Sequence, residues 1–64
     1  MKITRKALVD LLDLAGDQCP LPLDAKHLQN VVDIQGYYAG IDRIFLPQTD
    51  REGNYCGWEA QLRF

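Results

Sequence analysis

The sequence lacks any long apolar run and any block of charge of one sign. Its 64 residues include seven basic and nine acidic side chains, mixed along the chain, and the formal net charge is −2. Proteins that bind nucleic acids usually concentrate basic residues in a patch or stripe, so we expect no direct binding to nucleic acid. The apolar stretch near the start is interrupted by Asp10, Asp13 and Asp17, and it therefore fits neither a signal peptide nor a membrane span.

Cysteine and histidine are scarce: the chain has Cys19, Cys56 and a single histidine, His27. A structural zinc site takes four such ligands at suitable spacing, so these scattered residues predict no metal site, and we expect no cofactor. No third group is placed to orient a Cys19–His27 pair for catalysis. Without a secretion signal we expect a cytoplasmic protein with reduced thiols, and a single Cys19–Cys56 disulfide is the alternative.

The chain is short, and 47% of its residues are hydrophobic. This composition supports one core, so we expect a single small domain over residues 1–64. Because the chain opens with Met1, we also expect a complete small soluble protein. A domain of this size hides only roughly 60% of the surface of its unfolded chain, which limits its stability. Self-association is one way to gain stability, so a homodimer is among the partners that we consider.

Two helices are predicted in the first half of the chain, over residues 4–15 and residues 25–35. Each has a residue typical of helix N-caps and a glycine that ends it; these are Thr4 and Gly16 for the first helix, and Asp24 and Gly36 for the second. The stripe expected to face the core follows helical spacing: Leu8, Leu11, Leu12 and Ala15 in the first helix, and the apolar Leu28, Val31 and Val32 with the polar Gln35 in the second. Because Val31 and Val32 are β-branched, a short strand over residues 31–34 is the alternative.

The last part of the chain predicts a β-hairpin. Apolar residues occupy every second position from Cys56 to Phe64, which is the period of a strand with one buried face. An earlier strand over residues 41–46 is followed by Pro47, which ends the strand or marks an edge. Residues 50–53 have the composition of a three-residue hairpin loop, with an aspartate first and a glycine in the left-handed position.

This loop predicts the register of the hairpin, with Asp50 opposite Asn54. Counting outward gives the expected pairs: Leu46 with Trp58, Ile44 with Ala60, and Asp42 with Leu62. The expected core face carries Ile44, Leu46, Cys56, Trp58, Ala60 and Leu62, and the other face carries Ile41, Arg43, Phe45, Tyr55, Glu59, Gln61 and Arg63. A two-stranded sheet is not stable alone, so we expect an α+β fold in which both helices pack on one face of the C-terminal antiparallel hairpin, in the order ααββ.

The second face of this hairpin is more apolar than exposure to water explains. Aromatic and arginine side chains are typical of interface cores; the candidate binding residues are Ile41, Arg43, Phe45, Tyr55, Glu59 and Arg63, with Tyr37 and Tyr38 nearby. We predict a small non-enzymatic module that binds a protein partner through this face, or by strand addition at the edge of its last strand. The alternative is that the chain's own tail or second helix covers this face. By analogy of size and acidic composition, the protein would be an adaptor, a regulator or an inhibitor, such as a phage-encoded inhibitor of a host defence complex.

A short motif indicates a different function. The segment Cys19-Pro20-Leu21-Pro22, within residues 12–22, resembles the signature of the small bacterial sulfur-carrier proteins of the CPxP family. The resemblance implies a cysteine at the start of a helix, which lowers its pKa, and a persulfide on Cys19, with Pro20 and Pro22 in their family positions. That family has a strand before the motif, where this sequence predicts a helix. Thiol or sulfur transfer through Cys19 is therefore the alternative function.

Overall fold

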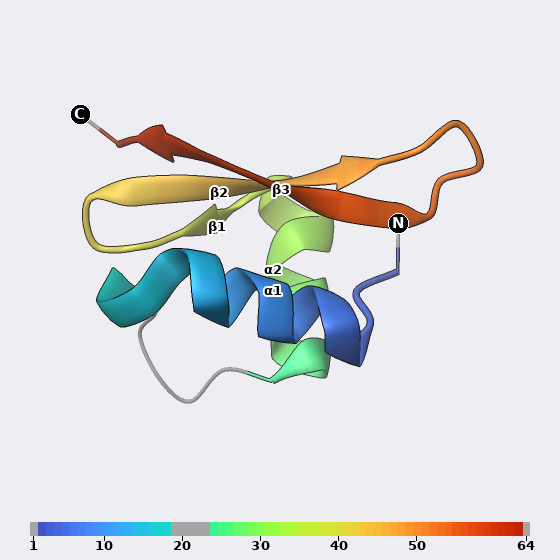
Figure 1. The fold of residues 1–64 in the computed structure, drawn as a ribbon, viewed down its shortest axis with the longest axis horizontal. Helices are drawn as coiled ribbons and strands as arrows, with labels where there is room; N and C mark the ends of the chain where they lie inside the picture. The colour runs from blue at the N-terminus through green and yellow to red at the C-terminus, as the bar shows by residue number, and fades with distance from the viewer. Residues whose placement is uncertain (1, 19–23, 64) are drawn as a thin grey trace.

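The computed structural model describes residues 2–18 and 24–63, and in them two helices precede a three-stranded sheet (Figure 1). The elements are α1 (Arg5–Ala15), a short 3-10 turn (Gly16–Gln18), α2 (Ala25–Gln35), β1 (Tyr38–Ala39), β2 (Arg43–Thr49) and β3 (Tyr55–Leu62). The strands are antiparallel and lie in the order β1-β2-β3. The predicted α+β class, with two helices before an antiparallel sheet, is confirmed.

Both helices have the predicted caps. The Thr4 hydroxyl accepts a 3.1 Å hydrogen bond from a backbone N–H in the first turn of α1, and the Asp24 carboxylate accepts a 2.7 Å bond at the same position of α2. Gly36, which follows α2, has a φ of +83°, a conformation that glycine adopts without steric cost. The helix is unbroken through residues 31–34, so the alternative of a strand there is wrong. The small propensity cost of two valines does not outweigh a capped helix with a buried face.

The sheet contains a short strand, β1, that the sequence pattern does not predict. Its two residues pair with β2, Tyr38 opposite Phe45 and Ala39 opposite Ile44. The backbone N–H of Gly40 donates a 2.7 Å hydrogen bond to the carbonyl of Arg43, which closes a tight turn between the strands. This turn returns the chain directly into β2, so the predicted two-stranded hairpin is corrected to a three-stranded sheet.

The second strand extends beyond its predicted end. It runs to Thr49 and includes Pro47. The short β1 pairs only with Ile44 and Phe45, so Pro47 lies where the outer side of β2 has no described strand beside it. Proline has no backbone N–H, but on this side of β2 no neighbouring strand needs one. Pro47 therefore marks an edge and does not end the strand.

The hairpin loop forms as predicted, but the register beyond it differs. The N–H of Asp50 donates a 3.0 Å hydrogen bond to the carbonyl of Asn54, the predicted partner. The Asp50 carboxylate also accepts a 2.9 Å bond from the N–H of Asn54. Past the loop, Thr49 pairs with Tyr55 and Gln48 with Gly57, so that Cys56 is an extra residue in a β-bulge.

The bulge shifts the pairing of β3 by one residue and exchanges the faces of β2. The observed pairs are Pro47 with Trp58, Leu46 with Glu59, Phe45 with Ala60, Ile44 with Gln61 and Arg43 with Leu62. The predicted pairs Leu46–Trp58, Ile44–Ala60 and Asp42–Leu62 are therefore wrong, because a slip of one residue moves side chains to the opposite face. Phe45 points toward the helices with Trp58 and Ala60, while Ile44 and Leu46 point away.

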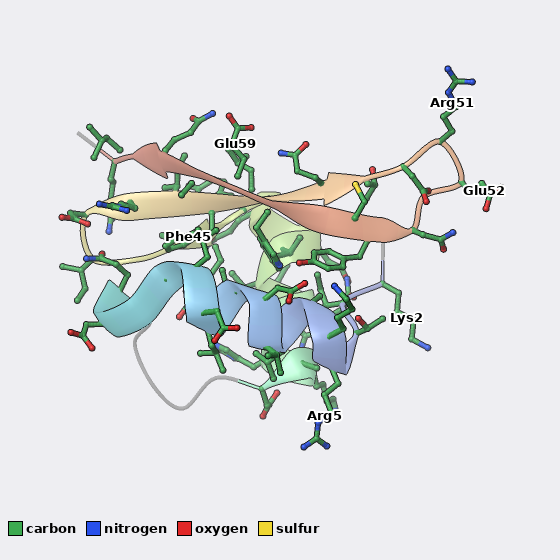
Figure 2. The ribbon with its side chains drawn as sticks, in the orientation of Figure 1. Lys2, Arg5, Phe45, Arg51, Glu52 and Glu59 are labelled. Carbon is green, nitrogen blue, oxygen red and sulfur yellow. The ribbon has the colours of Figure 1, made fainter. Side chains whose placement is uncertain are left out.

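The hydrophobic core lies between the helices and the sheet. In Figure 1, α1 and α2 lie on the same side of the sheet, with α1 along it and α2 crossing behind. The buried residues are Ile3, Ala7, Leu11, Ala15, Leu28, Val32, Tyr38 and Phe45, and Tyr55, Trp58 and Ala60 are partly buried against them. Phe45, Leu11 and Leu28 are the largest fully buried side chains of the described residues. Figure 2 shows Phe45 between the sheet and the helices.

Candidate functional site

The predicted binding face does not form, because its aromatic side chains point into the core. Phe45 is 0% exposed and Tyr38 is 4% exposed, so a partner cannot reach either residue in this structure. Tyr55 is half-buried and packs against the same core. The prediction that these three side chains form an exposed surface is wrong, because the bulge reverses the faces of β2 and the unpredicted β1 pairs Tyr38 with Phe45. Tyr37 is exposed at the end of α2.

The face of the sheet that points away from the helices is mainly polar. The Glu59 carboxylate accepts a 3.2 Å hydrogen bond from the Gln48 amide and a 3.3 Å bond from the Gln61 amide. All three side chains are exposed, and Ile44 and Leu46 beside them are half-buried. Figure 2 shows Glu59 on the side of the sheet opposite the helices, as predicted for this residue. Such a hydrogen-bonded polar surface is typical of contact with water, so it is a weak candidate for a protein interface.

Two aliphatic side chains are exposed where β3 ends and β2 begins. Leu62 is 74% exposed and Ile41 is 64% exposed. The Arg43 side chain, opposite Leu62 in the sheet, is also exposed. The guanidinium of Arg63 donates a 3.0 Å hydrogen bond to the carbonyl of Gly40, which holds the end of β3 against the turn between β1 and β2. Of the predicted binding residues, Ile41, Arg43 and Arg63 are thus brought together at this end, which we call the apolar end after Ile41 and Leu62.

The last strand, β3, has an open edge. It is terminal in the sheet order, so no described strand lies on its outer side. The N–H of Arg63 donates a 2.9 Å hydrogen bond to the carbonyl of Asp42, so the backbone of Arg63 faces the β2 side of the strand. Backbone groups of an antiparallel strand point to alternate sides, so every second residue before Arg63 also faces β2. The residues between them, Trp58, Ala60 and Leu62, point their N–H and C=O groups outward, and these groups form what we call the open edge.

The opposite edge of the sheet is less suited to pairing. The strand β1 is only two residues long. Beyond it, the outward-facing position of β2 is occupied by Pro47, which has no N–H to donate. Short strands and proline are two devices by which proteins prevent an edge from pairing with another chain. The open edge of β3 has neither.

Tyr55 joins the start of β3 to α1 through a small polar cluster. Its hydroxyl donates a 2.9 Å hydrogen bond to Oδ2 of Asp10, which also accepts a 2.8 Å bond from Lys6. The bond from Lys6, followed by that from Tyr55, lowers the pKa of Asp10 below its ordinary 3.8. Burial, followed by the hydrogen bond to Asp10, raises the pKa of Tyr55 to about 12. At neutral pH the hydroxyl therefore keeps its proton, and the cluster acts as an attachment between β3 and α1 and not as a proton-transfer pair.

A cavity of about 260 Å³ lies beside this cluster, lined by Lys2, Thr4, Lys6, Gly53, Asn54 and Tyr55. Figure 2 shows Lys2 pointing outward from the N-terminal segment. The lining holds no carboxylate, cysteine or histidine, so it offers neither a nucleophile with a base nor a ligand set for a metal. Elsewhere in residues 2–18 and 24–63, no three His, Cys, Asp or Glu side chains are grouped to hold a metal ion.

The structure describes one of the two cysteines, Cys56. Cys56 occupies the bulge and carries an exposed, free thiol. Cys19 and the rest of the Cys-Pro-Leu-Pro motif lie outside the described residues, as does the proposed Cys19–Cys56 disulfide. The residues that lead to the motif form α1 and the 3-10 turn, so the strand that the sulfur-carrier resemblance implies at this place is wrong. His27 is an exposed residue near the start of α2.

The first helix leaves part of its apolar surface exposed. Val9, Leu12 and Leu14 are exposed, while Leu11 and Ala15 are buried. Leu12 was expected in the buried stripe, and its exposure corrects that prediction. The cause is visible in the sequence, because apolar residues cover most of the circumference of α1 and one sheet face can cover only a part of it.

Comparisons with known proteins supply no family. A search against protein-family models, curated proteins and solved structures found no match for this chain. Among the described residues, no helix is both long enough and apolar enough to cross a membrane.

Proposed function

We propose that this chain is a non-enzymatic, cytoplasmic protein-interaction module that binds an extended segment of a partner along the open edge of β3. The observation that carries the proposal is the row of outward N–H and C=O groups of Trp58, Ala60 and Leu62, in the part of β3 that follows the bulge. An added strand satisfies such groups with main-chain hydrogen bonds, which supply affinity. Modules that work in this way serve as adaptors, regulators or inhibitors, because they occupy a segment that another protein would use.

Side chains beside the open edge give the bound segment its selectivity. Leu62 is largely exposed at one end of the edge, and Ile41 is exposed next to Asp42, which pairs with Arg63. An aliphatic residue of the partner segment would cover Leu62 and bury both surfaces. This end carries two positive charges, on Arg43 and Arg63, and one negative charge, on Asp42, so its local charge is positive. We therefore expect the segment to carry an acidic residue near this end.

The attachment of β3 to α1 supports the proposal. The Trp58 indole N–H donates a 3.0 Å hydrogen bond to the carbonyl of Ala7, and the Tyr55 hydroxyl donates one of 2.9 Å to Asp10. These two contacts fix β3 from the helix side while its outward groups stay free. A strand held in this way loses little conformational entropy when a partner binds, which favours affinity.

Two substitutions at the open edge test this function. Ala60→Pro removes an outward N–H and leaves the hydrogen bonds to β2 in place, and Leu62→Lys puts a charge on an exposed edge position. We expect capture of partner proteins by the tagged chain in its native host, quantified by mass spectrometry, to fall by about tenfold or more. The reason is that a lost main-chain hydrogen bond together with a steric clash exceeds about 1.4 kcal/mol.

Matched variants separate the alternatives. Arg51→Ala changes an exposed side chain of the hairpin loop, away from the open edge, and it should retain the partner. Cys19→Ser removes the sulfur acceptor that the family resemblance implies, and it should also retain the partner. Circular dichroism confirms that each variant is folded. Full capture by folded Ala60→Pro and Leu62→Lys, or loss of capture with Cys19→Ser, would contradict strand addition at β3.

A further inference from the structure

We infer that the open edge of β3 fits a second copy of the same chain, giving an antiparallel six-stranded sheet with a two-fold axis at Ala60. This inference rests on the proposed strand addition at β3 and names its partner. Three properties of β3 support it: its outward backbone groups, its side chains and its charges. Each of them matches the same property of a second β3 strand that runs antiparallel to the first.

The backbone groups are self-complementary. The outward residues Trp58, Ala60 and Leu62 are spaced symmetrically about Ala60. A two-fold axis perpendicular to the sheet at Ala60 places each outward residue opposite an outward residue of the second copy. Such residues exchange both N–H and C=O hydrogen bonds in an antiparallel ladder. A contact of this kind uses the same patch on both chains, as the commonest protein dimers do.

The side chains on the helix side also match. In this register Leu62 lies opposite Trp58 of the second copy, and Ala60 lies opposite Ala60. Leu62 is 74% exposed in the single chain, and Trp58 is only partly buried. Pairs of an aromatic with an aliphatic side chain across two strands stabilise a sheet by roughly 0.2–1 kcal/mol each. The small alanine at the axis lets the two larger pairs meet without a clash.

Charge on the outer face is compatible with this register and disfavours the register centred on Glu59. With the axis at Ala60, Glu59 lies opposite Gln61 of the second copy, and the amide can donate to the carboxylate. The same two residue types already make a 3.3 Å hydrogen bond within one chain. Moving the axis by one residue toward the start of β3 would place Glu59 opposite Glu59, and like charges in that position are destabilising.

The helix layer continues across this joint. A two-fold axis perpendicular to the sheet keeps the helices of both copies on one side. Of the two helices, α1 is the one that contacts β3, through Ala7 and Asp10. The two α1 helices would therefore flank the joint, with the Lys6–Asp10 ion pair of each helix beside Tyr55 of its own β3. Such a dimer would cover Leu62, which the single chain leaves largely in water, and this burial favours association.

Assembly should stop at two chains. The free edges of the joined sheet would be β1 and the part of β2 that contains Pro47. These edges are short or lack a donor, so a third chain has no long edge to extend. The inference therefore predicts a dimer and not a fibre.

Engineered cysteines read out the register directly. Glu59→Cys and Gln61→Cys are each made in a Cys19→Ser, Cys56→Ser background, because both positions are exposed and tolerate a small side chain. Opposite residues of this type have Cα atoms about 4.5 Å apart, which suits a disulfide. We expect oxidised mixtures of the two variants to form a cross-linked pair containing one chain of each. Neither variant alone should cross-link efficiently, and Gln48→Cys, on the same face but in β2, should not cross-link.

Sedimentation of the unmodified chain supplies the second readout, and we expect the mass of a dimer that Leu62→Lys converts to a monomer. Cross-linking of Glu59→Cys or Gln61→Cys with itself in preference to the mixture would overturn the register. A monomer at all concentrations would overturn the second copy as partner. If that monomer still captures another protein through the open edge, strand addition stands and only the inferred dimer fails. If Ala60→Pro and Leu62→Lys also leave capture unchanged, both fail.

Discussion

The indole N–H of Trp58 donates a 3.0 Å hydrogen bond to the backbone carbonyl of Ala7, 51 residues earlier in the chain. Ala7 is fully buried, so this bond joins the last strand to the centre of the core. One helical turn further on, Asp10 accepts the hydroxyl bond from Tyr55. The two contacts fix β3 against one face of α1, and they leave the outward backbone groups of β3 available to a partner.

Replacing Trp58 by phenylalanine should remove the donor while keeping an aromatic ring in place. We expect the free energy of unfolding to fall by about 1 to 2 kcal/mol, from the lost hydrogen bond and the smaller ring. Urea unfolding followed by circular dichroism measures this change. Gln61→Ala, an exposed change in the same strand, is the control and should leave the free energy of unfolding within about 0.5 kcal/mol. Equal stability of Trp58→Phe and the wild type would mean that this bond contributes nothing.

The raised pKa of Tyr55 predicts that the free energy of unfolding depends on pH in the alkaline range. Its pKa is raised to about 12 in the folded chain, whereas an unfolded tyrosine ionises near 10. Between these values the unfolded chain binds fewer protons than the folded one, so stability falls as pH rises from about 10 to about 12. The full contribution is present below pH 10. Tyr55→Phe should flatten this part of the curve, which urea unfolding at a series of alkaline pH values measures.

Tyr37→Phe is the matched control, because it removes a tyrosine hydroxyl from an exposed position outside the cluster. It should leave the alkaline loss of stability as steep as in the wild type. The same slope in Tyr55→Phe and in the wild type would rule out the Tyr55–Asp10 bond as its source.

The elements of this fold were predictable where a local cause decides them. Thr4 and Asp24 cap their helices because their side-chain oxygens reach a backbone N–H three residues later. The loop after Asp50 forms because its carboxylate and carbonyl bind backbone groups within four residues. Each of these arrangements depends on neighbours in the sequence, so the sequence pattern was sufficient.

The register of the hairpin was not predictable in the same way. Ile44, Phe45 and Leu46 are consecutive apolar residues, so either face of β2 offers side chains for the core. The alternation along β3 stays the same in both registers and cannot distinguish them. The bulge at Cys56 is favoured by the tertiary structure, because it buries Phe45 completely between the sheet and the helices. The sequence predicts an exposed edge on the last strand, but which of its residues point outward depends on this register.

Phe45 should therefore behave as a core residue and not as a binding residue. Phe45→Ala removes a fully buried ring, and large-to-small changes of this kind cost about 3–5 kcal/mol. A domain of 64 residues has little more stability than this, so we expect the variant to be largely unfolded by circular dichroism. Phe45→Leu, which keeps most of the apolar volume, should remain folded with reduced stability. A folded Phe45→Ala variant that merely loses its partner would restore the original interpretation of this residue.

Gly40 tests how closely the turn between β1 and β2 approaches the core. A Cβ atom at this position would lie 2.9 Å from Cε2 of Phe45 and 3.0 Å from the carbonyl oxygen of Gln18. A ring locked in the core and a backbone oxygen both resist displacement, so we expect Gly40→Ala to destabilise the fold by about 1–3 kcal/mol.

Gly36→Ala provides the comparison for Gly40→Ala, since a Cβ at Gly36 meets no atom within 4 Å and only its φ of +83° opposes the change. That conformational cost is about 1 kcal/mol, because alanine adopts the left-handed region less readily than glycine. Thermal unfolding of the two variants should place Gly40→Ala below Gly36→Ala in melting temperature. The opposite order would mean that the ring of Phe45 can move aside, and that the core beneath the turn is less tightly packed than the distances around Gly40 indicate.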